Sequence, residues 1–358
     1  MADKYEDSSS FSMGKSAQER GLSYVPKCYE AQAFDKSKSD ANIWDAPTID
    51  LARIADPTHR SILVQQVANA CRNHGFFQIV NHGIAEATVE GALSVASTFL
   101  NLSTESKAKY MSNDVHNPVR YGTSLKDGVD KLQFWRTFLK HYSHPLNHWI
   151  HMWPDSPLHY RQKMGEYVVE LQKLAEKMMG LISESLGVGP NYWKKKVDEG
   201  MQVMTVNGYP ACPQPELALG LPPHSDYCCL TLLLQDSPGL QILDRGTNTW
   251  MLVPVVEGAI QIHVGDQLEV LTNGLYKSVV HRVVLNSDKP RISVAGLHAL
   301  GMDVPVEPLP EMPDARRYRQ SSFSDFLDFI SKNDLGQGRG FLDTLKINVD
   351  DTTRDRQI

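Results

Sequence analysis

Two imidazoles and one carboxylate could bind a metal ion at His224, Asp226 and His281. This ligand set is the facial triad, which holds Fe(II) on one face and leaves the remaining positions open for substrate oxygens and dioxygen. A structural zinc site instead closes its shell with four ligands, usually including cysteine. Because the adjacent Cys228 and Cys229 lack the spacing of a zinc motif, the pattern favours a site that does chemistry over one that only stabilises the fold.

The sequence around His281 allows two interpretations. Residues two apart share one face of a strand, so His281 would point inwards with Val279 and Val283. A histidine among inward valines needs a metal or a hydrogen-bond partner. The alternative to a metal ligand is a core histidine bonded to a backbone carbonyl. Because the chain has 13 histidines, a His-x-Asp pair could also arise by chance, and the pair alone is weak evidence.

A second polar group follows at Arg291 and Ser293. Strand alternation places both on one face with Ala295 and Leu297, towards the same interior as the triad. A buried arginine requires an anion, and a dicarboxylate would satisfy it by chelating the metal with one end and accepting charge-assisted hydrogen bonds with the other. The alternative is a solvated arginine at a strand edge.

Short β-type segments separated by turns are expected to position these residues. The expected strands are Cys228–Gln235, Leu240–Leu243, Trp250–Val255, Ala259–Val264, Gln267–Leu271, Tyr276–Leu285 and Arg291–Leu300. Turn signals separate them at the spacing of a sandwich or barrel. No helical pattern intervenes, which disfavours a parallel Rossmann sheet. The usual nucleotide-binding and α/β-hydrolase motifs are absent.

The first half of the chain is expected to be mostly helical. Asp56 provides an N-cap before Pro57, and Gly75 provides a stop signal. The expected elements are a helix from Pro57, a strand at Phe76–Val80 and helices at Glu86–Leu100 and Tyr160–Leu186, with a further amphipathic segment at Phe323–Ile330. We therefore expect an α+β protein with four regions: a polar tail (1–45), a mainly helical region (46–200), a β core (201–305) and a C-terminal helical segment and tail (306–358).

Composition and charge restrict the partners. The 358 residues carry a net charge of −6, so no basic excess is available to neutralise nucleic acid or anionic lipid. Five cysteines without a CxxC motif indicate a reducing compartment. No apolar stretch approaches the length of a membrane span or a signal segment. We expect a cytoplasmic monomer that binds a small molecule and neither nucleic acid nor membrane.

Several motifs together resemble the plant-type family of 2-oxoglutarate- and Fe(II)-dependent dioxygenases. Besides the His-x-Asp, His and Arg-x-Ser residues, the markers are Asn207-Gly-Tyr-Pro-Ala-Cys-Pro213, Gly75-Phe-Phe-Gln-Ile-Val-Asn-His-Gly83, Leu230–Asp236 and Gly265-Asp266. The resemblance covers about Thr48 to Ile347 and is strongest to the flavanone 3-hydroxylase-like and salicylate-hydroxylase-like branches. It implies a double-stranded β-helix, or jelly-roll, core with the helical N-terminal region packed around it.

The resemblance also implies which residues function. Fe(II) would be bound by His224, Asp226 and His281, and 2-oxoglutarate by Arg291, Ser293, Tyr209 and Asn207. One departure is Gly208, where family members commonly have a tyrosine. This difference affects the packing beside the pocket, because the matching cosubstrate ligand, Tyr209, is retained.

The implied activity is hydroxylation or another oxidation of a small aromatic metabolite, with O2 as oxidant, ascorbate as reductant and conversion of 2-oxoglutarate to succinate and CO2. Candidate substrate-wall residues are Tyr121, Phe134, Trp135, Arg136 and Leu297. Leu297 lacks the ring that flavonoid-oxidising relatives carry there, so we expect a compact, largely apolar substrate. The alternatives are an oxidase that needs no 2-oxoglutarate, of the aminocyclopropane-carboxylate oxidase type, and a non-catalytic ligand-binding jelly roll.

Four further histidines fall between His141 and His151. Their spacing would suit a metal-binding helix face, but Pro145 interrupts such a helix, and no carboxylate or cysteine accompanies them. We expect a loop or the end of a strand here.

Overall fold

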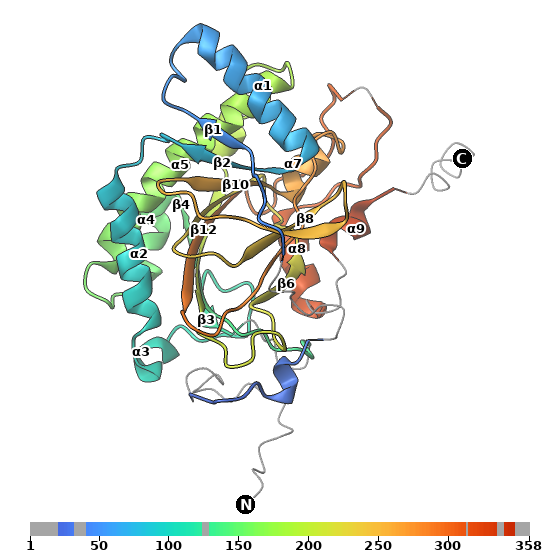
Figure 1. The fold of residues 1–358 in the computed structure, drawn as a ribbon. Helices are drawn as coiled ribbons and strands as arrows, with labels where there is room; N and C mark the ends of the chain where they lie inside the picture. The colour runs from blue at the N-terminus through green and yellow to red at the C-terminus, as the bar shows by residue number, and fades with distance from the viewer. Residues whose placement is uncertain (1–20, 32–40, 124–128, 313, 335–339, 348–358) are drawn as a thin grey trace, which may run out of the picture.

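The computed structural model describes residues 21–31, 41–123, 129–312, 314–334 and 340–347 (Figure 1). A four-stranded sheet forms one side of its β core. Its strands are β6 (Leu221–His224), β8 (Leu240–Asp244), β9 (Thr249–Leu252) and β11 (His281–Val283). They are ordered β6-β11-β8-β9 and are antiparallel throughout.

An eight-stranded sheet forms the other side. Its strands are β1 (Thr48–Asp50), β2 (Phe76–Val80), β3 (Val119–Gly122), β4 (Thr137–His144), β5 (Met201–Tyr209), β7 (Leu230–Gln235), β10 (Ile260–Val264) and β12 (Arg291–Ala299). The order is β1-β2-β10-β7-β12-β5-β4-β3, and only the β1/β2 pair is parallel. The two facing sheets form the jelly-roll core that was expected. Four of these strands come from the 46–200 range, which therefore adds to the sheet as well as covering it.

The helices cover the large sheet and close one end of the core. They are α1 (Pro57–Asn73), α2 (Glu86–Leu100), α3 (Thr104–Ala108), α4 (Leu146–Trp149), α5 (Tyr160–Ser185), α6 (Lys194–Asp198), α7 (Asp266–Leu271), α8 (Phe323–Lys332) and α9 (Phe341–Leu345), with 3-10 turns η1 (Lys27–Tyr29) and η2 (Ile150–Met152). Figure 1 shows α2 and α5 on the outer side of the large sheet and α8 and α9 beside the small one. Segregated helices on a mainly antiparallel sheet define the expected α+β class. We find no helix in the described ranges with the length and hydropathy needed to cross a bilayer.

Local signals explain where the first helix begins and ends. The Asp56 carboxylate accepts hydrogen bonds from the Thr58 and His59 amides, and Pro57 occupies the first turn. After the helix, Gly75 adopts a φ of +68°, and a Cβ there would lie 2.2 Å from the Lys277 carbonyl oxygen. Only glycine fits this position, which fixes the direct passage from α1 into β2.

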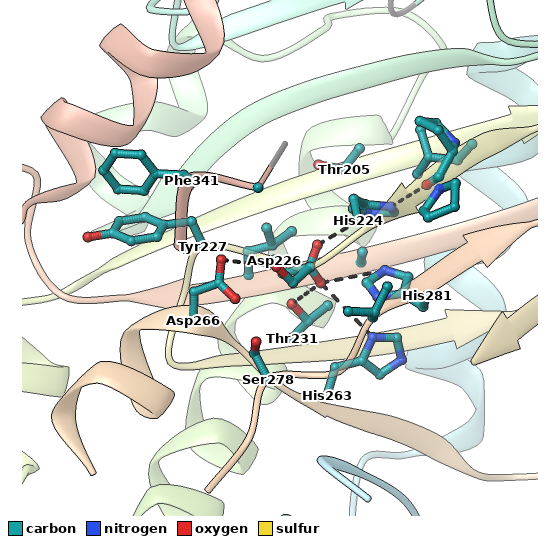
Figure 2. Close-up of a pocket in the computed structure, with 18 of the residues that line it drawn as sticks. Thr205, His224, Asp226, Tyr227, Thr231, His263, Asp266, Ser278, His281 and Phe341 are labelled. Atoms are coloured by element: carbon teal, nitrogen blue, oxygen red, sulfur yellow. Dashed lines mark hydrogen bonds and ion pairs between the residues drawn. The ribbon is translucent and has the colours of Figure 1, made fainter. Parts of the chain in front are cut away.

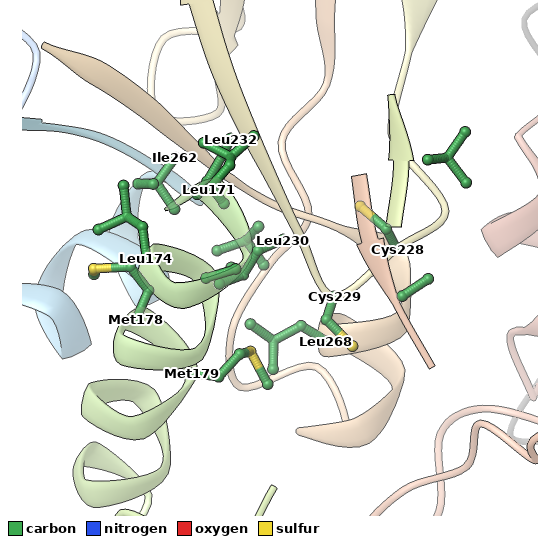
Figure 3. Close-up of a cluster of buried hydrophobic side chains, with 14 of the residues drawn as sticks. Leu171, Leu174, Met178, Met179, Cys228, Cys229, Leu230, Leu232, Ile262 and Leu268 are labelled. Carbon is green, nitrogen blue, oxygen red and sulfur yellow. The ribbon is translucent and has the colours of Figure 1, made fainter. Parts of the chain in front are cut away.

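The main hydrophobic core lies between α5 and the outer face of the large sheet. Figure 3 shows Leu171 and Leu174 of α5 against Leu232 of β7 and Ile262 of β10. Every residue of β7 is buried, because helices cover one face and the second sheet covers the other. Successive side chains of this strand therefore point alternately into the hydrophobic core and into the interior of the jelly roll.

Two of the expected strands need correction, and one observed strand was not expected. Gln267–Leu271 is helix α7 rather than a strand, and all six residues of that helix are buried, so its apolar run has no period that separates helix from strand. The expected strand Tyr276–Leu285 is reduced to β11. Strand β6 was not expected, because Pro222 and Pro223 are poor strand residues. It lies at the edge of the small sheet, where proline is tolerated.

The expected N-terminal tail also differs in part. Residues 1–20, 32–40 and 348–358 lie outside the described residues, but 21–31 pack onto the protein. Val25 and Tyr29 are buried, and the Tyr29 ring contacts the Trp135 ring edge-on with centroids 5.3 Å apart. This segment is therefore part of the folded unit.

Candidate metal and cosubstrate site

The three candidate ligands come together at one end of the small sheet. His224 ends β6 and pairs in register with His281, the first residue of β11, and Asp226 lies in the loop after β6. Figure 2 shows the three side chains converging. Nε2 of His224 lies 3.7 Å from Oδ1 of Asp226, and Nε2 of His281 lies 3.9 Å from its Oδ2. One ligand atom from each residue lies within 4.8 Å of the others, so a single ion could contact all three.

Backbone carbonyl groups orient both imidazoles. Nδ1 of His224 lies 2.8 Å from the Pro222 carbonyl oxygen, and Nδ1 of His281 lies 3.3 Å from that of Val279. A carbonyl only accepts, so each Nδ1 carries the proton and each Nε2 presents a lone pair to the shared space. The two interpretations of His281 are thus compatible, because it is bonded to a carbonyl through one nitrogen and faces Asp226 with the other.

The protonation states also suit metal binding. Burial and repulsion from His281 lower the pKa of His224. Burial alone would raise the pKa of Asp226, but the imidazoles of His281 and His224 outweigh it, and the net pKa is lowered. At neutral pH, His224 is therefore neutral and Asp226 is ionised, as metal ligation requires.

Hydrogen bonds from neighbouring elements hold the Asp226 loop. The Thr231 hydroxyl of β7 donates to Oδ2 of Asp226 over 2.6 Å. The amide of Asp266, at the start of α7, donates to the Asp226 carbonyl oxygen over 2.8 Å, and the Ser225 hydroxyl donates to the Asp266 carboxylate over 3.1 Å. Thr231 was not among the predicted site residues. Its alternation with Leu230 and Leu232 could have placed its side chain on the inner face of the strand.

The side chain of Arg291 is held in a position where it could bind an anion. Its Nε donates to the Ser237 carbonyl oxygen over 3.1 Å and its Nη2 to Oε1 of Gln235 over 2.8 Å. Nη1 is buried and has no hydrogen-bond partner among the described residues. Gly239 makes room for this side chain, because a Cβ there would lie 2.9 Å from Cδ of Arg291. A buried guanidinium with one unpaired donor fits the distal carboxylate of a dicarboxylic acid.

A cavity of about 720 Å³ connects this arginine with the triad. It is lined on the large-sheet side by Arg291, Ser293 and Leu297 of β12 and by Thr205, Asn207 and Tyr209 of β5. Nδ2 of Asn207 donates to the Ser293 hydroxyl oxygen over 3.2 Å, and the Arg291 guanidinium lies 5.1 Å from the centre of the Tyr209 ring. The expected metal and cosubstrate residues thus share one cavity, whose volume is typical of small-molecule sites.

Only two of the five residues expected to form the substrate wall line this cavity. Arg136 and Leu297 line the cavity, whereas Tyr121, Phe134 and Trp135 do not. Tyr121 belongs to the main core, Trp135 packs with Tyr29, and Phe134 lies in a separate small cluster. The aromatic rings of this segment therefore stabilise the packing of the N-terminal residues, and only the charged side chain at its end reaches the cavity.

A stability measurement can check this placement. Trp135→Ala is expected to lower the free energy of unfolding by about 3–5 kcal/mol, because it removes a large buried ring from a packed cluster. The Michaelis constant of the substrate should stay unchanged. Urea denaturation and steady-state kinetics on the same preparation measure the free energy of unfolding and the Michaelis constant. An altered Michaelis constant at unchanged stability would mean that Trp135 contacts the substrate.

The histidines between His141 and His151 surround the end of a strand, as expected. Strand β4 ends at His144, and α4 and η2 follow. His141 is fully buried between the Ser143 and Tyr160 hydroxyl groups, whereas His148 and His151 are exposed. Across the described ranges, the residues found to group at least three metal-ligating side chains are His224, Asp226 and His281.

This fold and site define a jelly-roll protein with a facial triad beside a cavity for an anion. Residues 200–299 match the family model of the 2OG-Fe(II) oxygenase superfamily, and residues 46–156 match that of the N-terminal region of non-haem dioxygenases in morphine synthesis. The chain belongs to this oxygenase family. It is a 2-oxoglutarate- and Fe(II)-dependent dioxygenase, as the sequence motifs indicated.

Similar proteins span nearly the whole chain. A rice (Oryza sativa subsp. japonica) protein named 2-oxoglutarate-dependent dioxygenase 21, chloroplastic, is 44% identical, with 84% of this chain and 91% of that protein covered. Flavanone 3-dioxygenase 3 of rice is 42% identical over 84% and 93%, and DOWNY MILDEW RESISTANCE 6 of Arabidopsis thaliana is 39% identical over 86% and 92%. The crystal structure of JOX2 in complex with 2OG, Fe and JA superposes with a TM-score of 0.82 at 32% identity, covering 91% of this chain and 95% of that one.

Proposed function

We propose that His224, Asp226 and His281 bind the Fe(II), that Arg291, Ser293, Tyr209 and Asn207 bind 2-oxoglutarate, and that the enzyme hydroxylates a small aromatic metabolite. The observation that carries this proposal is the common cavity of about 720 Å³. It has an imidazole and carboxylate donor set on one wall and the unpaired Nη1 of Arg291 on the other. When bound, the metal and cosubstrate supply the oxidising chemistry, coupled to formation of succinate and CO2.

The chain's own residues would orient the two small molecules and exclude water. Arg291 would fix the cosubstrate at its distal carboxylate, and Ser293 and Tyr209 would hold it from the same sheet face. Phe138 of β4, Phe326 and Phe329 of α8 and Phe341 of α9 line the same cavity. These rings support an aromatic substrate, since ring pairs add to the free energy of area burial.

A turnover assay tests the proposal. The protein is incubated with Fe(II), ascorbate and O2 over a panel of flavonoids, simple phenolics, indoles and hormones, with and without 2-oxoglutarate. Succinate and the product mass are measured together. We expect at least one product that gains one oxygen atom in proportion to succinate. Product formation without 2-oxoglutarate would indicate an oxidase that does not need it, and 2-oxoglutarate binding without turnover of any compound would favour a ligand-binding jelly roll.

Leu297 allows a test of the substrate end of the cavity. Leu297→Phe should change product yield or substrate preference by about 2- to 10-fold, because a ring pair is worth about 0.5–1.5 kcal/mol. The apparent constant for 2-oxoglutarate should not change. If the variant matches wild type on every substrate of the panel, Leu297 does not contact substrate.

We further propose that the protein is a cytoplasmic monomer. Four of the five cysteines are buried thiols outside any disulfide bond of the described residues, which supports a reducing compartment. Light scattering after size exclusion and imaging of a carboxy-terminal fluorescent fusion would test the two parts of this proposal separately.

A further inference from the structure

We infer that Arg120, Arg136 and Lys140 form a carboxylate-binding end of the substrate cavity, so that the substrate is an organic acid. This inference rests on the proposed function, because it names the class of small molecule that the same cavity accepts. It also alters the expectation of a largely apolar substrate. The three residues are called the basic cluster below.

The basic cluster lies on one face of two neighbouring strands. Lys140 of β4 is paired in register with Arg120 of β3. Arg136 lies immediately before β4 and four residues before Lys140, an even spacing that places all three on the same side of the sheet. Phe138 lies between them, with the Arg120 guanidinium 5.1 Å and the Arg136 guanidinium 4.7 Å from its ring centre. All four side chains line the cavity that contains the triad.

The opposed cations Arg120 and Lys140 are unfavourable for the protein alone, although the Asp114 and Asp130 carboxylates offset part of the cost at Arg120. Like charges directly opposite on neighbouring strands repel one another, and burial removes the water that would screen them. Arg120 is only 7% exposed. Burial is the main cause that lowers the pKa of Arg120 to about 10 and the pKa of Lys140 to about 7, and mutual repulsion within the cluster adds to both shifts. An anion in the cavity would relieve this repulsion.

Several hydrogen bonds from the cluster go to neutral acceptors. Nε of Arg120 donates to the Ser112 carbonyl oxygen over 2.6 Å, and Nζ of Lys140 donates to that of Val115 over 2.8 Å. Arg136 donates from Nε to Oδ1 of Asn207 over 3.0 Å. These contacts hold the side chains in place, and the Asp114 and Asp130 carboxylates favour the charged form of Arg120 without overcoming its burial. A carboxylate is the smallest organic anion that could accept from two such donors at once.

The basic cluster is separate from the cosubstrate end. Arg291 is on β12, whereas the cluster is on β3 and β4 at the far edge of the same sheet, with β5 between β12 and β4. Asn207 of β5 bridges the two groups, because it accepts from Arg136 and donates to Ser293. Two anion sites in one cavity match two acids, with 2-oxoglutarate on Arg291 and the substrate on the cluster. The aromatic side chains Phe138, Phe326 and Phe329 would contact the apolar body of the substrate.

The cluster has a measurable electrostatic signature. Lys140 faces Arg120 on β3, Asp114 in the preceding loop and the Tyr142 ring on its own strand. Since burial keeps its pKa near 7, Lys140 is charged below this pH and loses its proton above it. Binding of a permanently ionised acid should therefore weaken as the pH rises from 6 to 8, and the slope should vanish in Lys140→Met.

Matched acids and esters test the inference. Benzoate, phenylacetate and cinnamate are compared with their methyl esters, which keep the ring and remove the charge. Binding is measured by calorimetry without oxygen on protein loaded with Fe(II) and 2-oxoglutarate, and again on protein without them. We expect at least one acid to bind about 10-fold or more tightly than its ester, since a hydrogen bond to a charged group is worth about 1.5–3 kcal/mol. Lys140→Met should remove most of this preference, and Lys140→Arg should retain it.

Two controls keep the outcomes separate. Lys173→Met removes an exposed lysine from α5 and should leave the preference intact, and binding of 2-oxoglutarate should be equal in all variants. Because Arg120→Met removes a second member of the cluster, it repeats the test if Lys140→Met folds poorly. If no acid binds more tightly than its ester, or if Lys140→Met and Arg120→Met both retain the preference, the inference is wrong. Failure to bind or convert 2-oxoglutarate would instead contradict the proposed function, because the acid and ester comparison does not depend on turnover.

Discussion

Replacing His224, Asp226 or His281 by alanine is expected to reduce substrate-coupled succinate formation by more than about 100-fold, because changes to groups that merely support a metal ligand already reduce affinity or activity by about 10- to 100-fold. Each residue supplies one of three protein ligands, and the group of ligand atoms within 4.8 Å of one another includes no fourth residue of the described ranges. Cys228 and Cys229 are buried, and burial raises both thiol pKa values, so neither provides a thiolate. His263 is the nearest further imidazole, with Nδ1 4.0 Å from Oδ2 of Asp226.

The three variants should remain folded, because the triad lies at one end of the small sheet and the main core lies behind the large one. His148→Ala and Asp303→Ala change the same residue types at exposed positions and should retain full activity. Thermal unfolding of all five proteins would identify any loss of structure. Calorimetric titration with Fe(II) under anaerobic conditions gives the readout that does not depend on turnover. A triad variant that binds Fe(II) as tightly as wild type would remove that residue from the ligand set.

The sequence predicted the metal and cosubstrate residues as one group, and the structure brings them into one cavity. The grouping could be predicted because each placement depends on short-range rules. Strand alternation places Arg291 and Ser293 on one face, and the two-residue spacing keeps His224 and Asp226 together where β6 ends. The contacts that hold them come from distant segments, as with Thr231 bonded to Asp226. Such contacts are set by strand order, which no local pattern contains.

The substrate wall was harder to predict because neighbouring residues in β4 and in the segment before it face different environments. Aromatic residues at Phe134 and Trp135 were natural candidates for contacting a ring, but both are buried in packing clusters. Arg120 and Lys140 were not singled out, since a single charged residue in a sequence is most often solvated. Their significance depends on the pairing of β3 with β4. The register brings a buried and a half-buried cation together in the cavity that contains the triad.

Arg291→Lys is expected to weaken 2-oxoglutarate binding by about 10- to 150-fold, although the positive charge is kept. The loss corresponds to one charge-assisted hydrogen bond, about 1.5–3 kcal/mol. Nε and Nη2 of Arg291 are occupied by Ser237 and Gln235, so the planar guanidinium is held while Nη1 is left for the ligand. An ammonium group has no such fork, and its shorter reach would leave either the anchoring acceptors or the cosubstrate without a donor.

The same geometry predicts that the effect is specific to the cosubstrate. Burial lowers the pKa of Arg291, so the protein maintains a charge here against a desolvation cost, and a bound carboxylate would offset that cost. The Michaelis constant for 2-oxoglutarate and its calorimetric dissociation constant should rise together, whereas Fe(II) affinity should stay unchanged. Arg316→Lys, which alters an exposed arginine, should change none of these values. An unchanged 2-oxoglutarate constant in Arg291→Lys would mean that another cation holds the distal carboxylate, and the basic cluster of Arg120, Arg136 and Lys140 would then be the group to test.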